Sequence, residues 1–278
     1  MPRELRERMT NVKSWLSDCL GRGAEICFPA TARRIAGGDL RARDGRLGRL
    51  ILRAQTRRAA RTGAWDTLGQ RLNTYWQGPD GDRFYTQFPE RFEQWFLGPH
   101  RPWADALVDA AANGPFTQLI EIGCGDGRVL ANLAERLPRI DSFTGLDLNQ
   151  SVVGRNRSTF AQNPRLHFET GDARQQLPLL LKPGTVIVTY GGVLEYVPPA
   201  DLLALFSLAS GKAPSIWALV EPLAAGFDCA RDMVSRATGL ESSFSHPYRR
   251  MLEQAGWRIE YEAAIRIEHR WITLVARA

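Results

Sequence analysis

Short apolar runs alternate with longer segments of mixed polarity through the second half of the chain. The runs predict strands near residues 117–122, 142–147, 166–170, 185–190 and 215–221. The segments between them carry helical spacing and predict helices near residues 128–137, 150–161, 200–210 and 228–237. Strands that alternate with helices form a parallel sheet with right-handed crossovers. A helix at 247–255 and two strands at 257–267 and 269–277 complete the predicted fold.

The first hundred residues follow a different pattern. Apolar positions three and four apart predict an amphipathic helix over residues 1–20, which Gly21-Arg22-Gly23 would end. Residues 41–61 predict a second helix with arginines around much of its circumference. We therefore expect two parts: an N-terminal helical region rich in arginine and aromatic residues (1–100), and an α/β domain (101–278).

Aromatic residues concentrate between Trp65 and Trp103. Most of them are expected to pack in a core, but aromatic side chains also wall apolar ligand pockets. Residues 78–81 (Gly-Pro-Asp-Gly) indicate a loop, and Trp76 and Tyr85 lie close to it. A helix over Ala104–Ala112 is expected to lead into the first strand.

A strand that turns through glycines into a helix dominates the middle of the chain, at Leu119–Leu130 (LIEIGCGDGRVL). Such a turn directs backbone N–H groups and a helix N-terminus at one point. The dinucleotide fingerprint G-x-G-x-x-G needs a third glycine where this chain has Arg128. Glu121 and Asp126 beside the turn would repel a pyrophosphate. A cationic ligand without phosphates fits better, and S-adenosylmethionine is one.

Further acids follow at successive strand ends. Asp147 ends the second strand, Asp172 follows the third, and the fourth runs into a loop within residues 184–198. With Glu121 and the glycine turn, this order resembles the class I S-adenosylmethionine-dependent methyltransferase family over about residues 103–278. The resemblance implies a doubly wound, mostly parallel seven-stranded sheet of Rossmann-like type under an N-terminal helical cap. It also implies an enzyme that uses S-adenosylmethionine.

The resemblance assigns roles around the cofactor. Asp147 would accept the ribose hydroxyls, Leu148 would pack on the adenine, and Asp172 would accept from the adenine amino group. The backbone near Gly123 and Tyr190 would hold the methionine part. The expected cofactor-binding residues are Glu121, Gly123, Cys124, Gly125, Asp147, Leu148, Asp172, Ala173, Tyr190 and Gly191.

Methyl transfer needs a base only when the acceptor must lose a proton. Candidates near the strand ends are Glu195, Tyr196, Glu221 and His246, and our hypothesis is that His246 or Glu195 faces the acceptor. Family members often carry histidine where this chain has Tyr196. The expected substrate contacts are Trp76, Tyr85 and Tyr196. No metal site is expected, since no D-x-D, H-x-H or E-x-x-H pattern follows the glycine turn.

Charge and composition change the picture modestly. Basic residues exceed acidic ones by nine in residues 1–65, whereas the rest of the chain is slightly acidic. Only three of the 36 basic residues are lysine, which indicates a general preference for arginine. Nucleic-acid binding is therefore the less favoured alternative. No apolar run approaches about 18 residues, so we expect no membrane span, and the charged N-terminus favours a cytoplasmic protein.

Three classes of function stay open. We favour methyl transfer to an O, N or C nucleophile of a small molecule, in specialised metabolism. The first alternative is an RNA or protein methyltransferase that uses the basic N-terminal region. The second is a non-catalytic, methyltransferase-like partner subunit. Transfer of the aminocarboxypropyl group would need much the same cofactor site. The N-terminal helices are also suited to a homodimer interface.

Overall fold

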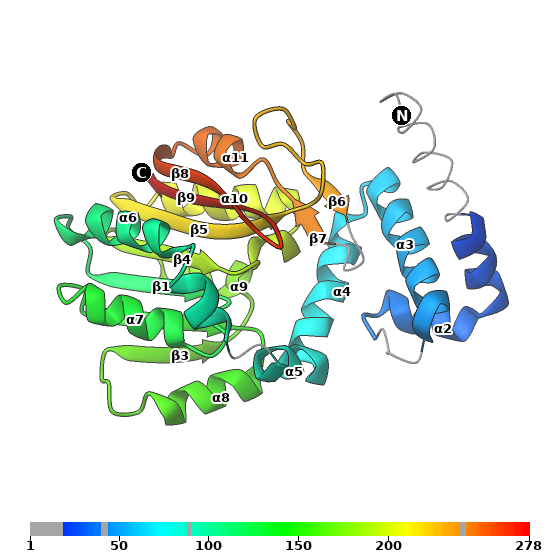
Figure 1. Cartoon of the computed structure of the whole chain (residues 1–278), viewed down its shortest axis with the longest axis horizontal. Helices are drawn as coiled ribbons and strands as arrows, with labels where there is room; N and C mark the ends of the chain where they lie inside the picture. The colour runs from blue at the N-terminus through cyan, green and yellow to red at the C-terminus, as the bar shows by residue number, and fades with distance from the viewer. Residues whose placement is uncertain (1–18, 40–43, 88–89, 239–242) are drawn as a thin grey trace. The chain divides into compact units, whose positions relative to one another are not determined.

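The computed structural model describes residues 19–39, 44–87, 90–238 and 243–278 (Figure 1). The chain divides into two compact units. Unit 1 comprises residues 1–75 and 236–244, and unit 2 comprises residues 76–235 and 245–278. Residues 76–100, which the sequence analysis grouped with the N-terminal region, thus belong to unit 2 by their contacts. No helix in the described ranges is long and apolar enough to cross a bilayer.

Unit 2 is built on a seven-stranded sheet with the order β3-β2-β1-β4-β5-β9-β8. Strands β1 to β5 pair in parallel, and β9 is antiparallel to both β5 and β8. The strands are β1 (Gln118–Ile122), β2 (Ser142–Asp147), β3 (Leu166–Thr170), β4 (Thr185–Tyr190), β5 (Ser215–Leu223), β8 (Arg258–Ile267) and β9 (His269–Arg277). The predicted sheet is confirmed, because long apolar runs between turn residues leave little choice of strand position.

Helices cover both faces of this sheet (Figure 1). One core cluster joins the sheet to α6 (Arg101–Ala112), α7 (Arg128–Arg136) and α8 (Gln150–Thr159). The other joins it to α9 (Ala173–Leu180), α10 (Pro199–Ser210) and α11 (Tyr248–Gln254). The parallel strands β1, β2 and β4 are buried on both sides, as expected for a sheet between two helical layers. Their carboxyl ends meet at one edge of the sheet, where ligands bind in folds of this type.

Three short elements lie near that edge. They are α5 (Pro79–Gln87), the π-helix η2 (Phe92–Phe96) and the 3₁₀ helix η3 (Leu194–Tyr196). The loop predicted at residues 78–81 is wrong, since Pro79 begins a helix, where proline's fixed φ suits the first turn. Gly81 is needed there because a Cβ would lie 2.4 Å from the carbonyl oxygen of Trp76.

The helix predicted near residues 228–237 is also wrong. The chain makes a single turn at Asp228 and then enters β6 (Arg236–Thr238). The carboxylate of Asp228 accepts from the Ala230 amide at 3.0 Å, and that of Asp232 accepts from the Asp228 amide at 2.7 Å. Aspartate side chains that bond to nearby backbone compete with helix formation.

Unit 1 is mainly helical. Its helices are residues 19–27, α2 (Pro29–Ala36), α3 (Gly45–Thr62) and most of α4 (Trp65–Gln77). The short pair β6 and β7 (Ser243–Ser245) adds Phe244 to a small core with Leu68. The helix predicted over residues 1–20 lies largely outside the described residues. Glycine 21 does not end a helix, because residues 19–27 are helical. A Cβ there would lie 2.6 Å from the Leu50 carbonyl oxygen, so this glycine permits close helix packing.

Candidate functional site

The glycine turn between β1 and α7 has the backbone that the sequence predicts. Gly123, Gly125 and Gly127 adopt φ values of 70°, 50° and 77°, a region that favours glycine. A Cβ on Gly123 would lie 2.5 Å from Cγ2 of Val193, and one on Gly127 would lie 2.8 Å from the ring of Phe160. The turn is therefore closely packed on two sides and depends on the absence of side chains.

Cys124 and Asn156 complete the packing of the turn. Cys124 is buried, and a Cβ on Gly145 of β2 would lie 2.8 Å from its sulfur. Burial raises the pKa of this thiol well above its usual value, so the residue is suited to packing rather than to nucleophilic chemistry. The side chain of Asn156 donates to the Gly125 carbonyl at 2.7 Å. Asn156 could not be predicted as part of the site, because a helix residue 31 positions away carries no local signal.

Asp147 joins the glycine turn to the end of β2. One carboxylate oxygen accepts from the Gly125 amide at 3.0 Å, and the other accepts from the Asn149 amide at 2.9 Å. The residue is 5% exposed. A carboxylate oxygen can accept more than one hydrogen bond, so this geometry is compatible with a diol ligand. Leu148, the proposed adenine contact, follows directly and is half-buried.

Glu121 is buried on β1 beside the same turn. Its Oε2 has no hydrogen-bond partner among the residues that the structure describes. Burial raises the pKa of Glu121 well above its usual value, and the nearby charges of Asp126 and Asp147 raise it further. A buried carboxyl oxygen without a donor is costly. Three clustered acids with such an oxygen fit a ligand that brings a positive charge and hydroxyl donors, as S-adenosylmethionine does.

Asp172 begins α9 and is held by Arg174. Its carboxylate accepts from the Arg174 amide at 2.9 Å and lies 2.6 Å from Nη2 of the same residue. Arg174 also reaches Asp201 of α10 at 2.8 Å, and its pKa is raised chiefly by the hydrogen bond to Asp172. Ala173 is the first residue of the helix, where N–H groups lack helical partners. Arg174 was not among the residues predicted for the site, although its guanidinium holds Asp172.

Tyr190 ends β4, followed by Gly191 and Gly192 at φ 86° and 90°. The Tyr190 hydroxyl lies 3.0 Å from Nδ1 of His100, which is fully buried. Burial raises the pKa of Tyr190 and lowers that of His100 to about 4, so both groups are uncharged near neutral pH. The Gly191 carbonyl accepts a long hydrogen bond of 3.5 Å from Arg91.

The structure brings two of the proposed substrate residues together. The rings of Trp76 and Tyr196 have centroids 5.2 Å apart at 59°, and Phe84 packs edge-on against Trp76 at 5.2 Å. The side chain of Tyr85 lies outside the described part of the molecule. Trp76 and Tyr196 thus form an aromatic pair. The pair lies near the end of β4, because η3, which contains Tyr196, begins four residues after that strand ends.

The two proposed bases differ in burial. Glu195 is partly exposed in η3, beside Tyr196. His246 is fully buried, and its Nδ1 lies 2.7 Å from the Ser235 hydroxyl. Burial lowers the pKa of His246 to about 3. A base must reach the proton that it removes, so this geometry favours Glu195 over His246.

Glu221 lies beneath η3, on β5. It is fully buried and accepts hydrogen bonds from the amides of Val193, Leu194 and Glu195 at 3.1–3.3 Å. Burial raises its pKa to about 8. The sequence indicated Glu221 only as a candidate base; in the structure it binds the backbone of the loop that follows β4.

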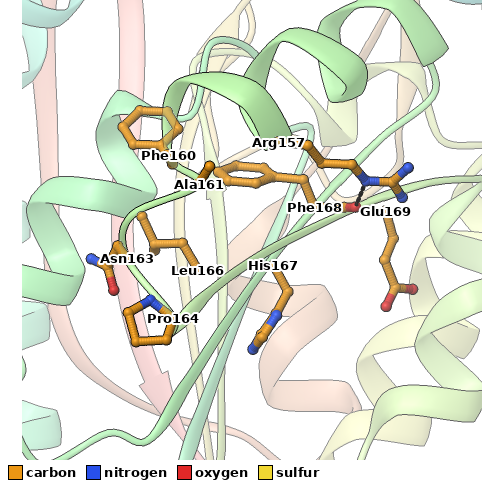
Figure 2. Close-up of a pocket in the computed structure, with 9 residues that line it drawn as sticks. All are labelled: Arg157, Phe160, Ala161, Asn163, Pro164, Leu166, His167, Phe168 and Glu169. Atoms are coloured by element: carbon orange, nitrogen blue, oxygen red, sulfur yellow. Dashed lines mark hydrogen bonds between the residues drawn. The ribbon is translucent and has the colours of Figure 1, made fainter.

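A surface cavity of about 420 Å³ lies elsewhere, along the edge strand β3 (Figure 2). Its lining includes Phe160, Leu166 and His167, and Arg157 donates to the Phe168 carbonyl at 2.8 Å across it (Figure 2). None of the residues proposed for cofactor or substrate lines it. The hydrogen bond from Arg157 satisfies a carbonyl on an open sheet edge, where unpaired groups invite association.

Comparisons with known proteins match the part of the chain that contains the glycine turn and the strands that follow it. Residues 119–210 match a family model described as a methyltransferase domain. A segment of 87 residues is 30% identical to trans-aconitate 2-methyltransferase of Deinococcus radiodurans, covering 31% of this chain and 32% of that protein. A segment of 113 residues is 27% identical to peramine synthetase ppzA of Metarhizium rileyi, covering 38% of this chain and 4% of that protein.

The matched segments thus span no more than about a third of these curated relatives. Among solved structures, magnesium protoporphyrin IX methyltransferase of Synechocystis PCC 6803, with bound S-adenosylmethionine, has a TM-score of 0.53 and 17% identity. The similarity covers 76% of this chain and 97% of that chain. It shows a shared fold, in agreement with the strand order of unit 2.

Proposed function

We propose that this chain, which belongs to the class I S-adenosylmethionine-dependent methyltransferase family, transfers a methyl group to an O, N or C nucleophile of a small molecule in specialised metabolism. The observation that carries the cofactor assignment is the pair of buried carboxyl groups at the glycine turn. Glu121 has an oxygen without a hydrogen-bond donor in the described part of the chain, and the Asp147 carboxylate accepts from the Gly125 amide of the turn. This pair accommodates a cation and a diol and repels phosphates.

Each neighbouring residue has a defined task in this proposal. Glu121 and the turn at Gly123 hold the cationic amino acid part, with the backbone of Tyr190 and Gly191 opposite. Asp147 accepts the ribose hydroxyls, and Leu148 packs on the adenine. Asp172 and the Ala173 amide bind the adenine edge. The bound cofactor supplies a methyl group already activated on sulfonium, so the protein mainly aligns the acceptor.

The aromatic pair Trp76 and Tyr196 supports a small acceptor with apolar surface. These rings lie beside η3, in the same segment as Glu195. In our proposal Glu195 removes a proton from acceptors that must lose one. His246 has a structural role, as a buried residue that contacts the Ser235 hydroxyl. An acceptor ionised before binding would need no base.

The cofactor assignment is tested by calorimetric titration of S-adenosylmethionine and S-adenosylhomocysteine into wild-type protein and two variants. Asp147→Ala should abolish binding, because it removes the diol acceptor and the support of Gly125. Asp109→Ala is the control: it removes an exposed acid on α6, outside the proposed site, and should leave binding intact. Absence of binding to folded wild-type protein would contradict the proposal and favour a non-catalytic subunit. Product analysis by mass spectrometry would distinguish methyl from aminocarboxypropyl transfer.

An RNA acceptor is the second candidate, and α3 is the observation that favours it. Arg46, Arg49 and Arg53 are exposed at spacings of three and four, which places them along one side of the helix. Arginine forks match phosphate geometry. If RNA binds this surface, replacing the three with alanine should weaken binding and flatten its salt dependence. Replacing exposed Arg139, Arg250 and Arg266 of unit 2 controls for net charge.

A homodimer through the N-terminal helices is a further proposal. The helix at residues 19–27 and its surroundings expose Leu20, Ile26 and Phe28, at 63%, 81% and 49%. Apolar side chains of this size favour association. Light scattering after size-exclusion chromatography, with Ile26→Ser as the variant, tests it: a monomeric wild-type protein would contradict the proposal.

A further inference from the structure

Three consecutive backbone amides after β4 converge on one buried carboxylate. The Val193 amide lies 3.1 Å from Oε2 of Glu221, and the Leu194 amide lies 3.1 Å from each oxygen. The Glu195 amide lies 3.3 Å from Oε2. Glu221 is on β5, which pairs with β4 up to Tyr190. The carboxylate is therefore an acceptor supplied by one strand to the loop that leaves its neighbour.

This contact solves a local problem of the chain. The helix η3 has only three residues, so its first amides have no helical acceptors. No side chain of the residue before it caps the helix. Buried amides without acceptors would each be costly. Glu221 satisfies three at once, and hydrogen bonds to a charged acceptor are stronger than neutral ones.

The loop at residues 193–195, which Glu221 holds, packs against the glycine turn. The side chain of Val193 packs where a Cβ of Gly123 would lie, 2.5 Å from Cγ2. The same loop carries Glu195 and Tyr196, the proposed acceptor residues. By holding the backbone of residues 193–195, Glu221 thus positions Val193 against the glycine turn. It also positions the loop that carries Glu195 and Tyr196, the two residues that we propose contact the acceptor.

We propose that Glu221 is a positioning residue whose ionised carboxylate locks residues 193–195 against the glycine turn, so that cofactor affinity depends on its charge. The inference rests on the proposed function for the identity of the ligand. Protonation would place an O–H donor among three N–H donors and remove part of their acceptor. The turn would then loosen, and Val193 would no longer pack firmly over Gly123.

The surroundings place this change near neutral pH. Burial, with a smaller contribution from the Glu195 carboxylate, raises the pKa of Glu221 to about 8 against the lowering effect of the hydrogen bonds from the three amides. Tyr248 faces it from α11, and its pKa is raised well above the usual value, so it stays uncharged. His246 adjoins Tyr248, with ring centroids 5.3 Å apart, and stays uncharged because burial lowers its pKa to about 3. A raised carboxyl pKa means that the ionised form is lost as the pH falls through about 8.

The test is calorimetric titration of S-adenosylhomocysteine at pH 6.5, 7.5 and 9, with wild-type protein, Glu221→Gln and Glu135→Gln. Glu135 is an exposed glutamate on α7, so its variant makes the same chemical change without the buried contacts. Wild type and Glu135→Gln should lose about thirtyfold in affinity from pH 9 to pH 6.5, because only the ionised fraction of Glu221 holds the turn and that fraction falls by this factor for a pKa of about 8. Glu221→Gln should bind weakly at every pH, with no pH dependence beyond that of the ligand.

Hydrogen exchange of the same amides separates this inference from the proposed function. The amides of residues 193–195 should be less protected from exchange in Glu221→Gln than in wild type. In wild type their protection, corrected for the pH dependence of the intrinsic exchange rate, should be lower at pH 6.5 than at pH 9. The Arg174 amide donates a hydrogen bond to the Asp172 carboxylate, and its exchange rate serves as the internal reference. Wild type that binds no ligand would refute the cofactor assignment while this comparison still tests the anchor. Glu221→Gln with wild-type affinity and exchange would overturn the inference. If that variant does not fold, the wild-type pH series decides alone.

Discussion

The hydroxyl of Tyr190 and Nδ1 of His100 lie 3.0 Å apart, although 90 positions separate the residues in the sequence. The contact ties the end of β4 to the residue that precedes α6. Phe96 and Trp103 pack around the Tyr190 ring, with centroids at 5.3 and 5.8 Å. A buried histidine whose Nε2 lacks a described partner depends on this single hydrogen bond.

Tyr190→Phe should therefore destabilise the protein. The change leaves a buried nitrogen of His100 without its partner, which costs about 1–3 kcal/mol. Chemical denaturation followed by circular dichroism measures the free energy of unfolding. Tyr261→Phe is the control, because Tyr261 is half-buried against the same core and no hydrogen bond of its hydroxyl is seen in the described structure. Equal stability of the two variants would show that the Tyr190–His100 contact contributes nothing.

His246 should contribute a loss of stability as the pH falls from 7 to 5, whereas buried carboxyl groups with raised pKa, such as Glu221, contribute in the opposite direction. The pKa of His246 in the folded protein is lowered to about 3 by burial, below the usual value of 6.5, so unfolding takes up a proton in this range. Folding keeps the His246 ring neutral. As the pH falls below about 6.5 the unfolded state is stabilised by protonation of this ring, and the folded state is not. For one such group the loss is about 2 kcal/mol between pH 7 and pH 5.

His246→Gln should lack that part of the pH dependence, whatever its stability at pH 7. His167→Gln, which changes an exposed histidine of β3, should keep the wild-type slope. Denaturant titrations at the two pH values measure both. A wild-type slope in His246→Gln would mean that the buried ring does not govern acid stability.

Gly123→Ala should abolish cofactor binding. The residue has φ 70°, and a Cβ would lie 2.5 Å from Val193, so the turn must shift. Gly154→Ala in α8 is the matched control, because nothing lies within 4 Å of its Cβ position. That change should leave binding intact and stabilise the protein by about 0.5–1 kcal/mol. Titration and denaturation of both variants test the pair, and retained binding in Gly123→Ala would contradict the proposed role of the turn.

The sheet could be predicted because its signals are local. Apolar runs that end at Asp147, Thr170 and Tyr190 define β2, β3 and β4, and the glycines of the turn announce their own backbone. The helix expected near residues 228–237 failed for an equally local reason that periodicity does not register. Asp228 and Asp232 bond to neighbouring backbone and stop the helix after one turn.

The candidate site was predicted in its acids and glycines but not in its supports. Glu221 binds amides 26 to 28 positions earlier, and Asn156 reaches back 31 positions to Gly125. Contacts of this kind depend on which strands become neighbours, and spacing along the chain does not encode that. Arg174 was missed for another reason: an arginine two residues after an acid usually points into solvent.

Arg174→Leu tests what that arginine does for the adenine end of the site. The guanidinium holds the Asp172 carboxylate at 2.6 Å, so its loss should let Asp172 rotate and weaken S-adenosylhomocysteine binding. The effect of a lost charged hydrogen bond is about 1.5–3 kcal/mol, or roughly tenfold to a hundredfold in Kd. Asp201→Asn removes the other partner of Arg174 and leaves the contact to Asp172, so its Kd should stay close to wild type. Tighter binding in Arg174→Leu would mean instead that Arg174 competes with the adenine for Asp172.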